Sequence, residues 1–327
     1  MTNVTAATRT ATAVSNAALR RRSTLPQVNG TSSAGKPAPA RSSAGKRPPK
    51  SQGFHSELDR QAVMTGAGGR HADSLKIDYH EANVQIDLSA GGHALLSGEL
   101  VHELTIDGRP VTSRGEWKSV CTYGDEDGDY LELQLCLTES LRIDRQLFLS
   151  RYDHFALLAD AVIATGAGRV EHRLRLPVAE KAPAKSDTPT REWQVGPARV
   201  FPLWLPQDRV LSAVGDCVQN GGGLNLSYTV GGDGLYLPVV FDWHPRHRRV
   251  AADWRTLTVT EPGRVVSPHG AAAHRLRIGK DQLLIYRGLA ATHEPRAVLG
   301  LHTWFETLIG WFDAKGELEA IMATETE

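Results

Sequence analysis

A strict two-residue alternation in the middle of the chain is the feature that most constrains its fold. In the segment 131–137, every odd position is leucine, and the even positions are Glu, Gln and Cys. Because successive side chains of a strand point to opposite faces, this period places the leucines on one buried face of an extended strand. Three further apolar runs follow at short spacing, over 141–149, 154–164 and 170–176. Short connections favour antiparallel neighbours, so we expect a central meander that is packed on one side.

Similar strand-like runs, bounded by Gly, Pro or Asp, recur on both sides of this meander up to the end of the chain. We find no amphipathic pattern that lasts for three helical turns, although the short apolar run 306–312 is ambiguous. Many strands without intervening helices indicate two packed layers of antiparallel sheet. We therefore predict an all-β fold, a large antiparallel β-sandwich over 76–327, preceded by a disordered basic low-complexity tail over 1–75.

The charge of the chain is distributed unevenly between its two parts. Residues 1–56 hold nine Lys or Arg and no acid, which leaves 28 basic residues against all 37 acidic ones in the rest. A segment rich in Ala, Thr, Ser, Gly and Pro cannot bury enough apolar surface to offset its ordering entropy, so we expect the tail to be disordered. It could contact nucleic acid electrostatically, but its one aromatic residue, Phe54, gives no indication of base stacking or specific recognition.

Targeting signals do not fix the compartment. The tail has no apolar core of the kind that a secretory signal needs, while its Arg-, Ser- and Thr-rich start also describes an organellar transit peptide. No apolar run reaches the length of a membrane span. Three cysteines, an odd and sparse number, argue against a disulfide framework.

One acidic loop is a candidate cation site. The segment 125–129 places four carboxylates in five residues, and calcium prefers oxygen clusters of this kind. The order of an EF-hand loop is not met because Gly128 comes too early. We therefore expect a solvated hairpin tip, and we predict neither a metal site nor a cofactor for this chain.

The densest polar cluster is DWHPRHRR at 242–249. Its two histidines and Asp242 are residue types that bind zinc, but the proline between the histidines breaks helical spacing and the arginines repel a cation. The same guanidinium groups suit carboxylate or sulfate, which they bind with two parallel hydrogen bonds. A solvated basic loop at a sheet edge is the competing interpretation. The predicted ligand-binding residues are His244, Arg246, His247, Arg248 and Arg249.

Asp160 interrupts an apolar run and should therefore be buried and paired. We expect an ion pair with an arginine such as Arg145 or Arg151, in preference to a catalytic or metal-binding pair with His172. Aromatic residues such as Trp304 and Trp311 could stack on sugar faces, although tryptophans of a sandwich are more often core anchors.

The segment 141–177 resembles the β-sandwich module that follows the helical toroid in heparinase II/III-like polysaccharide lyases. The similarity lies in an arginine-led strand, RQLFL at 145–149, an apolar strand that contains Asp, LLADAV at 157–162, and a following strand with His, EHRL at 171–174. The family has an α/α helical domain before this module, with much of its catalytic machinery. The resemblance implies an accessory sandwich that contacts carbohydrate or serves as a scaffold, because we expect only a disordered tail at that position.

Three hypotheses follow. The first is a non-enzymatic binding or accessory β-sandwich that contacts an acidic polysaccharide through the arginine cluster. The second is a polysaccharide lyase or hydrolase, because lyase chemistry needs a Tyr or His base and a cation that neutralises a uronate carboxylate. Tyr286, Arg287, His274 and His302 supply these residue types. The third is an assembly protein with a flexible basic arm. The sequence favours the first hypothesis and leaves the oligomeric state open.

Overall fold

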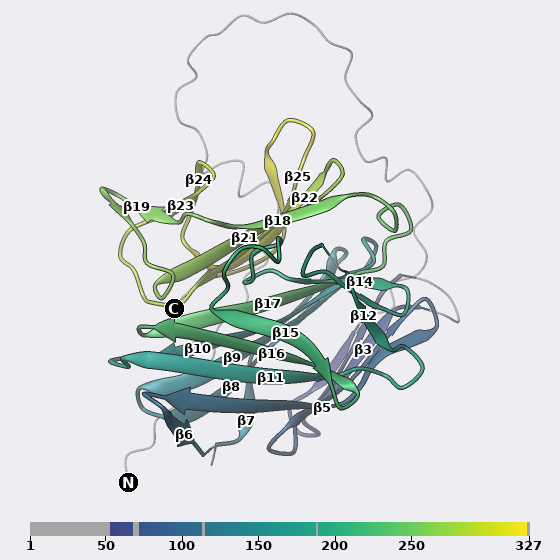
Figure 1. Ribbon diagram of the computed structural model, residues 1–327, viewed down its shortest axis with the longest axis horizontal. Helices are drawn as coiled ribbons and strands as arrows, with labels where there is room; N and C mark the ends of the chain where they lie inside the picture. The colour runs from purple at the N-terminus through teal and green to yellow at the C-terminus, as the bar shows by residue number, and fades with distance from the viewer. Residues whose placement is uncertain (1–52, 68–71, 113–114, 188, 326–327) are drawn as a thin grey trace, which may run out of the picture.

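A computed structural model describes residues 53–67, 72–112, 115–187 and 189–325. The described residues contain strands and no helix, and every strand pairing between neighbours is antiparallel (Figure 1). The prediction of an all-β antiparallel sandwich is therefore confirmed. Within this part of the chain, no helix is long and apolar enough to cross a membrane.

An eight-stranded sheet forms the middle of the molecule, in the order β12-β13-β14-β17-β10-β9-β8-β7. It contains the predicted meander, whose strands β8, β9 and β10 pair with one another through short turns. Its strands are β7 (Trp117–Gly124), β8 (Gly128–Thr138), β9 (Leu141–Ser150), β10 (Phe155–Ala164), β12 (Ala184–Ser186), β13 (Trp193–Val195), β14 (Ala198–Pro202) and β17 (Gly234–Asp242).

A nine-stranded sheet covers one face of the eight-stranded sheet, in the order β1-β2-β3-β4-β5-β11-β16-β15, with β6 added to β5. Its strands are β1 (Phe54–Ser56), β2 (Gln61–Thr65), β3 (Ser74–Asp78), β4 (Val84–Ala90), β5 (His93–Ile106), β6 (Arg109–Val111), β11 (Arg169–Pro177), β15 (Gly215–Asn220) and β16 (Gly223–Gly231).

Two smaller sheets follow in the last part of the chain, drawn from green to yellow in Figure 1. One has five strands in the order β18-β21-β22-β25-β26, and the other has four in the order β20-β19-β23-β24. The ambiguous run 306–312 belongs to strand β25. The strands are β18 (Ala252–Leu257), β19 (Thr260–Glu261), β20 (Arg264–Val265), β21 (Ala271–Ile278), β22 (Asp281–Gly288), β23 (Arg296–Val298), β24 (Leu301–Thr303), β25 (Phe305–Phe312) and β26 (Leu318–Glu325).

Both faces of the eight-stranded sheet are covered. On one face, the leucines of β8 join residues of the nine-stranded sheet in one hydrophobic core. On the other face, Phe148, Leu157 and Tyr236 pack against Trp254 and other residues of the five-stranded sheet in a second core. The expectation that the meander is packed on one side is therefore wrong. A strand that is buried on both faces needs partners for its polar side chains, and the second interface supplies them.

The ordered sheet begins earlier in the chain than residue 76. Strands β1 and β2 and the start of β3 lie in the segment that we expected to be disordered, whereas residues 1–52 lie outside the described residues. In β2, the side chains of Ala62 and Met64 are buried and their neighbours are not. This alternation spans only five residues, which is too short to stand out from a region of low complexity.

Candidate functional site

The arginine cluster lies in the loop that joins β17 to β18, where the chain passes from the eight-stranded to the five-stranded sheet. Two turns hold its backbone, with the amide of His247 donating to His244 O at 2.9 Å and that of Val250 donating to His247 O at 3.1 Å. We call residues 243–251 the arginine loop.

His247 fixes this loop to the body of the protein. Its side chain is buried, with Nδ1 2.7 Å from Asp242 Oδ2 and Nε2 3.1 Å from Asp281 Oδ2. Burial alone would lower the pKa of His247, but hydrogen bonds and charge from Asp242 and Asp281 raise it overall. His247 therefore ties the loop to the end of β17 and the start of β22, and neither of its nitrogens faces a ligand.

Arg199 supports the loop backbone as well. Its buried guanidinium donates through Nη1 to His247 O at 2.8 Å and to Val250 O at 2.7 Å, and its Nε and Nη2 bind the carboxylate of Glu192. The guanidinium carbon also lies 5.1 Å from the ring centre of Phe201. These contacts hold the loop backbone at two of its carbonyl groups.

The three arginines of the loop point away from this anchor. Arg246, Arg248 and Arg249 are exposed, and none of them forms an ion pair with a described residue. Lys280 is also exposed, in the neighbouring turn, where Gly279 N donates to Ala251 O at 3.0 Å. The loop therefore presents three exposed arginines, while the nearby carboxylates of Asp242 and Asp281 bind His247.

A row of imidazole rings borders the arginine loop. The ring centre of His244 lies 4.6 Å from that of His247 and 5.8 Å from that of His154, which precedes β10. Nδ1 of His154 is 2.8 Å from Oδ2 of buried Asp73, and this hydrogen bond raises the pKa of His154. The pKa of His244 is lowered by burial and by the charge of His247.

The contact of His154 with Asp73 was not predicted from the sequence. Asp73 lies in the segment assigned to the tail, and His154 in a turn. Asp73 also accepts hydrogen bonds from Trp243 Nε1 at 2.9 Å and from Gly91 N at 2.8 Å. Only the fold brings these groups together, because they are far apart in sequence. The described residues contain no group of His, Cys, Asp and Glu that could hold a metal ion.

The expected ion pair of Asp160 is confirmed. Arg145 donates through Nε and Nη2 to the two carboxylate oxygens of Asp160, both at 2.8 Å, and His172 Nε2 lies 2.9 Å from Oδ2. All three side chains are buried. Burial alone would raise the pKa of Asp160, but the charge of Arg145 holds it well below its ordinary value. His172 completes this ion pair instead of forming an open catalytic pair.

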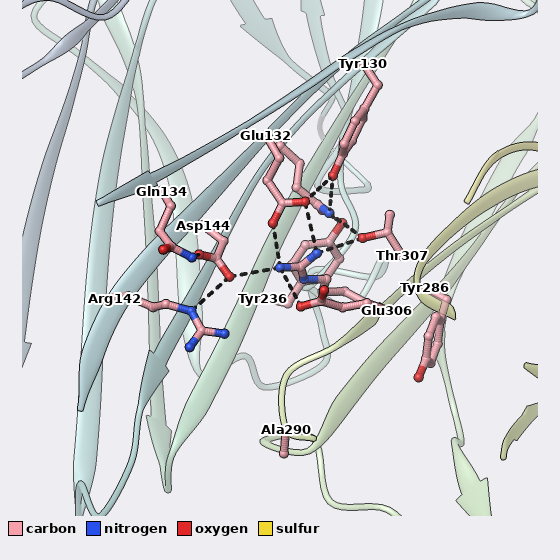
Figure 2. Close-up of polar contacts among 12 residues, drawn as sticks. Tyr130, Glu132, Gln134, Arg142, Asp144, Tyr236, Tyr286, Ala290, Glu306 and Thr307 are labelled. Carbon is pink, nitrogen blue, oxygen red and sulfur yellow. Dashed lines mark hydrogen bonds and ion pairs between the residues drawn. The ribbon is translucent and has the colours of Figure 1, made fainter. Parts of the chain in front are cut away.

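A second buried polar network lies between the eight-stranded and five-stranded sheets, around Arg287 of β22 (Figure 2). Arg287 Nη2 lies 2.7 Å from Glu132 Oε1, 2.9 Å from Asp144 Oδ2 and 3.2 Å from Glu306 Oε1. Burial lowers the pKa of Arg287, but these carboxylates raise it well above its ordinary value. Arg287 therefore neutralises the polar face of β8 and β9 where the second sheet covers it.

Neutral side chains complete this network. Tyr130 Oη donates to Glu132 Oε2 at 2.7 Å and accepts from Gln146 Nε2 at 2.9 Å. Tyr236 Oη donates to Gln146 Oε1 at 2.7 Å, and Thr307 Oγ1 accepts from Arg287 Nη1 at 2.8 Å. Such extensive pairing fits a structural connection between the two sheets.

The residues proposed for lyase chemistry do not meet in one cleft. Arg287 is enclosed in the network, and His274 is buried on the opposite face of the five-stranded sheet from Tyr286. His302 is exposed on β24. Burial raises the pKa of Tyr286, which disfavours the phenolate that a catalytic base requires. This arrangement argues against the lyase hypothesis.

The acidic hairpin tip is more ordered than expected. Asp129 is buried, where its Oδ1 accepts from Arg151 Nη2 at 2.7 Å and its Oδ2 accepts from Thr65 N at 3.0 Å. Asp125 Oδ2 accepts from Tyr123 Oη at 2.6 Å. The expectation of a fully solvated tip is wrong for Asp129, whose carboxylate joins β8 to β2.

Comparison with known proteins finds similarity among solved structures. No protein-family model and no curated protein sequence matches the chain. A heparinase III gene product has a TM-score of 0.47 at 9% identity over 74% of this chain, and heparan sulfate lyase HepC from Pedobacter heparinus has 0.47 at 11% identity over 76%. These matches cover 43% and 44% of the two proteins, so this chain corresponds to less than half of either length. The resemblance noted in the sequence agrees with these matches.

Proposed function

We propose that this protein is a non-enzymatic β-sandwich that binds an acidic polysaccharide through the arginine loop. One observation supports the proposal above all others: Arg246, Arg248 and Arg249 are exposed and have no described carboxylate partner, on a loop whose backbone is held by His247 and Arg199. Guanidinium groups bind sulfate and carboxylate with paired hydrogen bonds. A preorganised loop loses little conformational entropy on binding such groups.

The charge of the rest of the body restricts how a polyanion can approach. Residues 57–327 hold 28 basic and 37 acidic residues, so a long polyanion meets net repulsion away from the loop. Within residues 57–327, the exposed arginines of the loop and neighbouring Lys280 place several positive charges close together. Trp243, the tryptophan within the loop, is half-buried and donates its Nε1 to Asp73, so it offers no platform for a stacked base. These features support a polysaccharide over a nucleic acid.

Binding to a heparin column tests the proposal with the full chain. We expect retention at low salt and elution as NaCl rises, because exposed ion pairs are screened. Replacing all three loop arginines by Gln should weaken binding about tenfold or more, since each exposed pair contributes up to about 1 kcal/mol.

The matched control replaces three exposed arginines outside the loop, Arg109, Arg169 and Arg255, by Gln. Both triple variants lower the net charge by the same amount, so only a local site makes them differ. If the control variant loses as much retention as the loop variant, or if neither changes it, the arginine loop is not the binding site. Elution by single-stranded DNA at a lower concentration than by free heparin would instead favour a nucleic-acid partner.

A further inference from the structure

A small pocket lies at the other end of the five-stranded sheet. Its volume is about 110 Å³, and its lining includes Arg142, Tyr286, Gly288, Arg296 and Trp304. Strand β22 runs from Asp281, which contacts the arginine loop, to Gly288, so the two sites are about 23 Å apart at the rise of a strand. The pocket is therefore separate from the arginine loop.

The aromatic wall of this pocket is Trp304. All seven tryptophans lie in the described residues, and Trp304 is the one that is exposed, at 54%. The others are buried or half-buried; for example, Trp254 and Trp311 anchor the second core. A tryptophan outside every core offers an apolar face to a flat ligand. The expectation that the tryptophans are core anchors thus fails at this one position.

The polar side of the pocket is rich in hydrogen-bond donors. Arg142 uses Nε to reach Asp144 Oδ2 at 3.3 Å, and Figure 2 draws no contact from its two terminal nitrogens to the other residues shown. Buried Arg296 is fixed by Glu261 at 3.0 Å and by Ala290 O at 2.8 Å, and its Nη1 has only a 3.5 Å contact with Tyr286 Oη. Burial raises the pKa of Tyr286, so its hydroxyl keeps its proton.

The absence of a side chain at Gly288 leaves space in front of these hydrogen-bond donors. A Cβ atom at position 288 would lie 2.9 Å from Arg296 Nη1 and 3.5 Å from Tyr286 Oη, so any larger residue would occupy the space in front of them. The charged groups that line the pocket are the guanidinium groups of Arg142 and Arg296 and the carboxylate of Glu306. Two positive charges against one negative charge favour the binding of an anion.

The geometry points to a binding site for a small carboxylate monoanion whose flat face packs on Trp304 and whose carboxylate accepts from Arg142, with Tyr286 and Arg296 at the base of the pocket. Planar carboxylates match the fork of a guanidinium. At about 110 Å³ the pocket is smaller than the usual site of a drug-sized ligand, so it admits the carboxylate end of a ligand and not a whole polymer. This inference does not depend on the arginine loop.

Fluorine NMR of the full chain labelled with 5-fluorotryptophan tests the inference. The Trp304→Phe variant assigns the Trp304 resonance. Benzoate and glucuronate serve as probes, and benzyl alcohol and glucose serve as their neutral counterparts. We expect the carboxylates to shift the Trp304 signal with saturation in the millimolar range, on the order of what ligands of this size achieve, and the neutral compounds to bind at least about tenfold more weakly.

Variants locate the site. Arg142→Gln should weaken carboxylate binding about tenfold, Arg142→Lys should weaken it less, and the control Arg255→Gln and the triple arginine-loop variant should leave it unchanged. Equal shifts with neutral and anionic probes, an unchanged affinity in Arg142→Gln, or no saturable shift at about 20 mM would each overturn the inference. Because the loop variant is measured separately on heparin, failure of one site is distinguishable from failure of the other.

Discussion

We expect the buried charge of Arg287 to have a large effect on the stability of the protein. It lies among Glu132, Asp144 and Glu306 with no exposed surface. Replacing it by Met would leave carboxylates in the interior without their counter-ion, so we expect a loss of about 3–5 kcal/mol in the free energy of unfolding, measured by urea denaturation. Adding Glu132→Gln to this variant should recover part of the loss, because one uncompensated charge is removed. A loss below about 1 kcal/mol would show that the network is not tightly coupled.

His274 makes a contribution of definite sign to the pH dependence of stability. It is buried, and burial lowers its pKa from 6.5 to about 4. Between these values the unfolded chain binds a proton that the folded chain does not, so stability is lost as pH falls from 6.5 towards 4. The full shift corresponds to about 3 kcal/mol. In His274→Gln, the free energy of unfolding should change less over this window than in the parent protein. The surface variant His302→Gln should keep the parent slope, and equal slopes in all three proteins would contradict this assignment.

At the scale of the strand, local sequence patterns correctly predicted one buried face and one hairpin turn. The leucines of β8 form the first core, and the Asp107-Gly108 turn joins β5 to β6 with positive φ values of 49° and 77°, as a tight hairpin requires. The other face of β8 was not predictable in this way. A glutamate on a strand usually faces solvent, yet Glu132 is covered by β22 and β25. A period of two shows that the two faces differ, but not what lies on them.

The candidate sites also differ in whether local sequence or long-range pairing forms them. The arginines of the loop after β17 could be found because they are adjacent in sequence, and Asp160 could be assigned an ion pair because one acid interrupts an apolar run. His154 and Asp73 are 81 positions apart, and Arg142 lies on β9 whereas Trp304 lies between β24 and β25, so no local pattern connects them. Sites assembled by long-range pairing depend on topology, which residue spacing does not specify.

At the scale of the whole molecule, the two main cores lie on opposite faces of the same strands. Residues of β9 and β10 belong alternately to the first and the second core, and Arg287 adds ionic contacts across the second interface. Loss of the five-stranded sheet would expose both Phe148 and the carboxylates of Glu132 and Asp144 to water, which leaves the eight-stranded sheet with one unsupported face.

The shared strands lead us to expect that the sheets unfold together. Tryptophan fluorescence reports on both cores, because Trp117 lies in the first and Trp254 and Trp311 in the second, whereas far-ultraviolet circular dichroism reports on all strands. In urea, the two signals should give coincident transitions in the parent protein. In Arg287→Met, the weakened second interface should allow the five-stranded sheet to open first, so that the fluorescence transition moves to lower urea than the dichroism transition. Separate transitions in the parent protein would show that the two cores are independent in spite of the strands that they share.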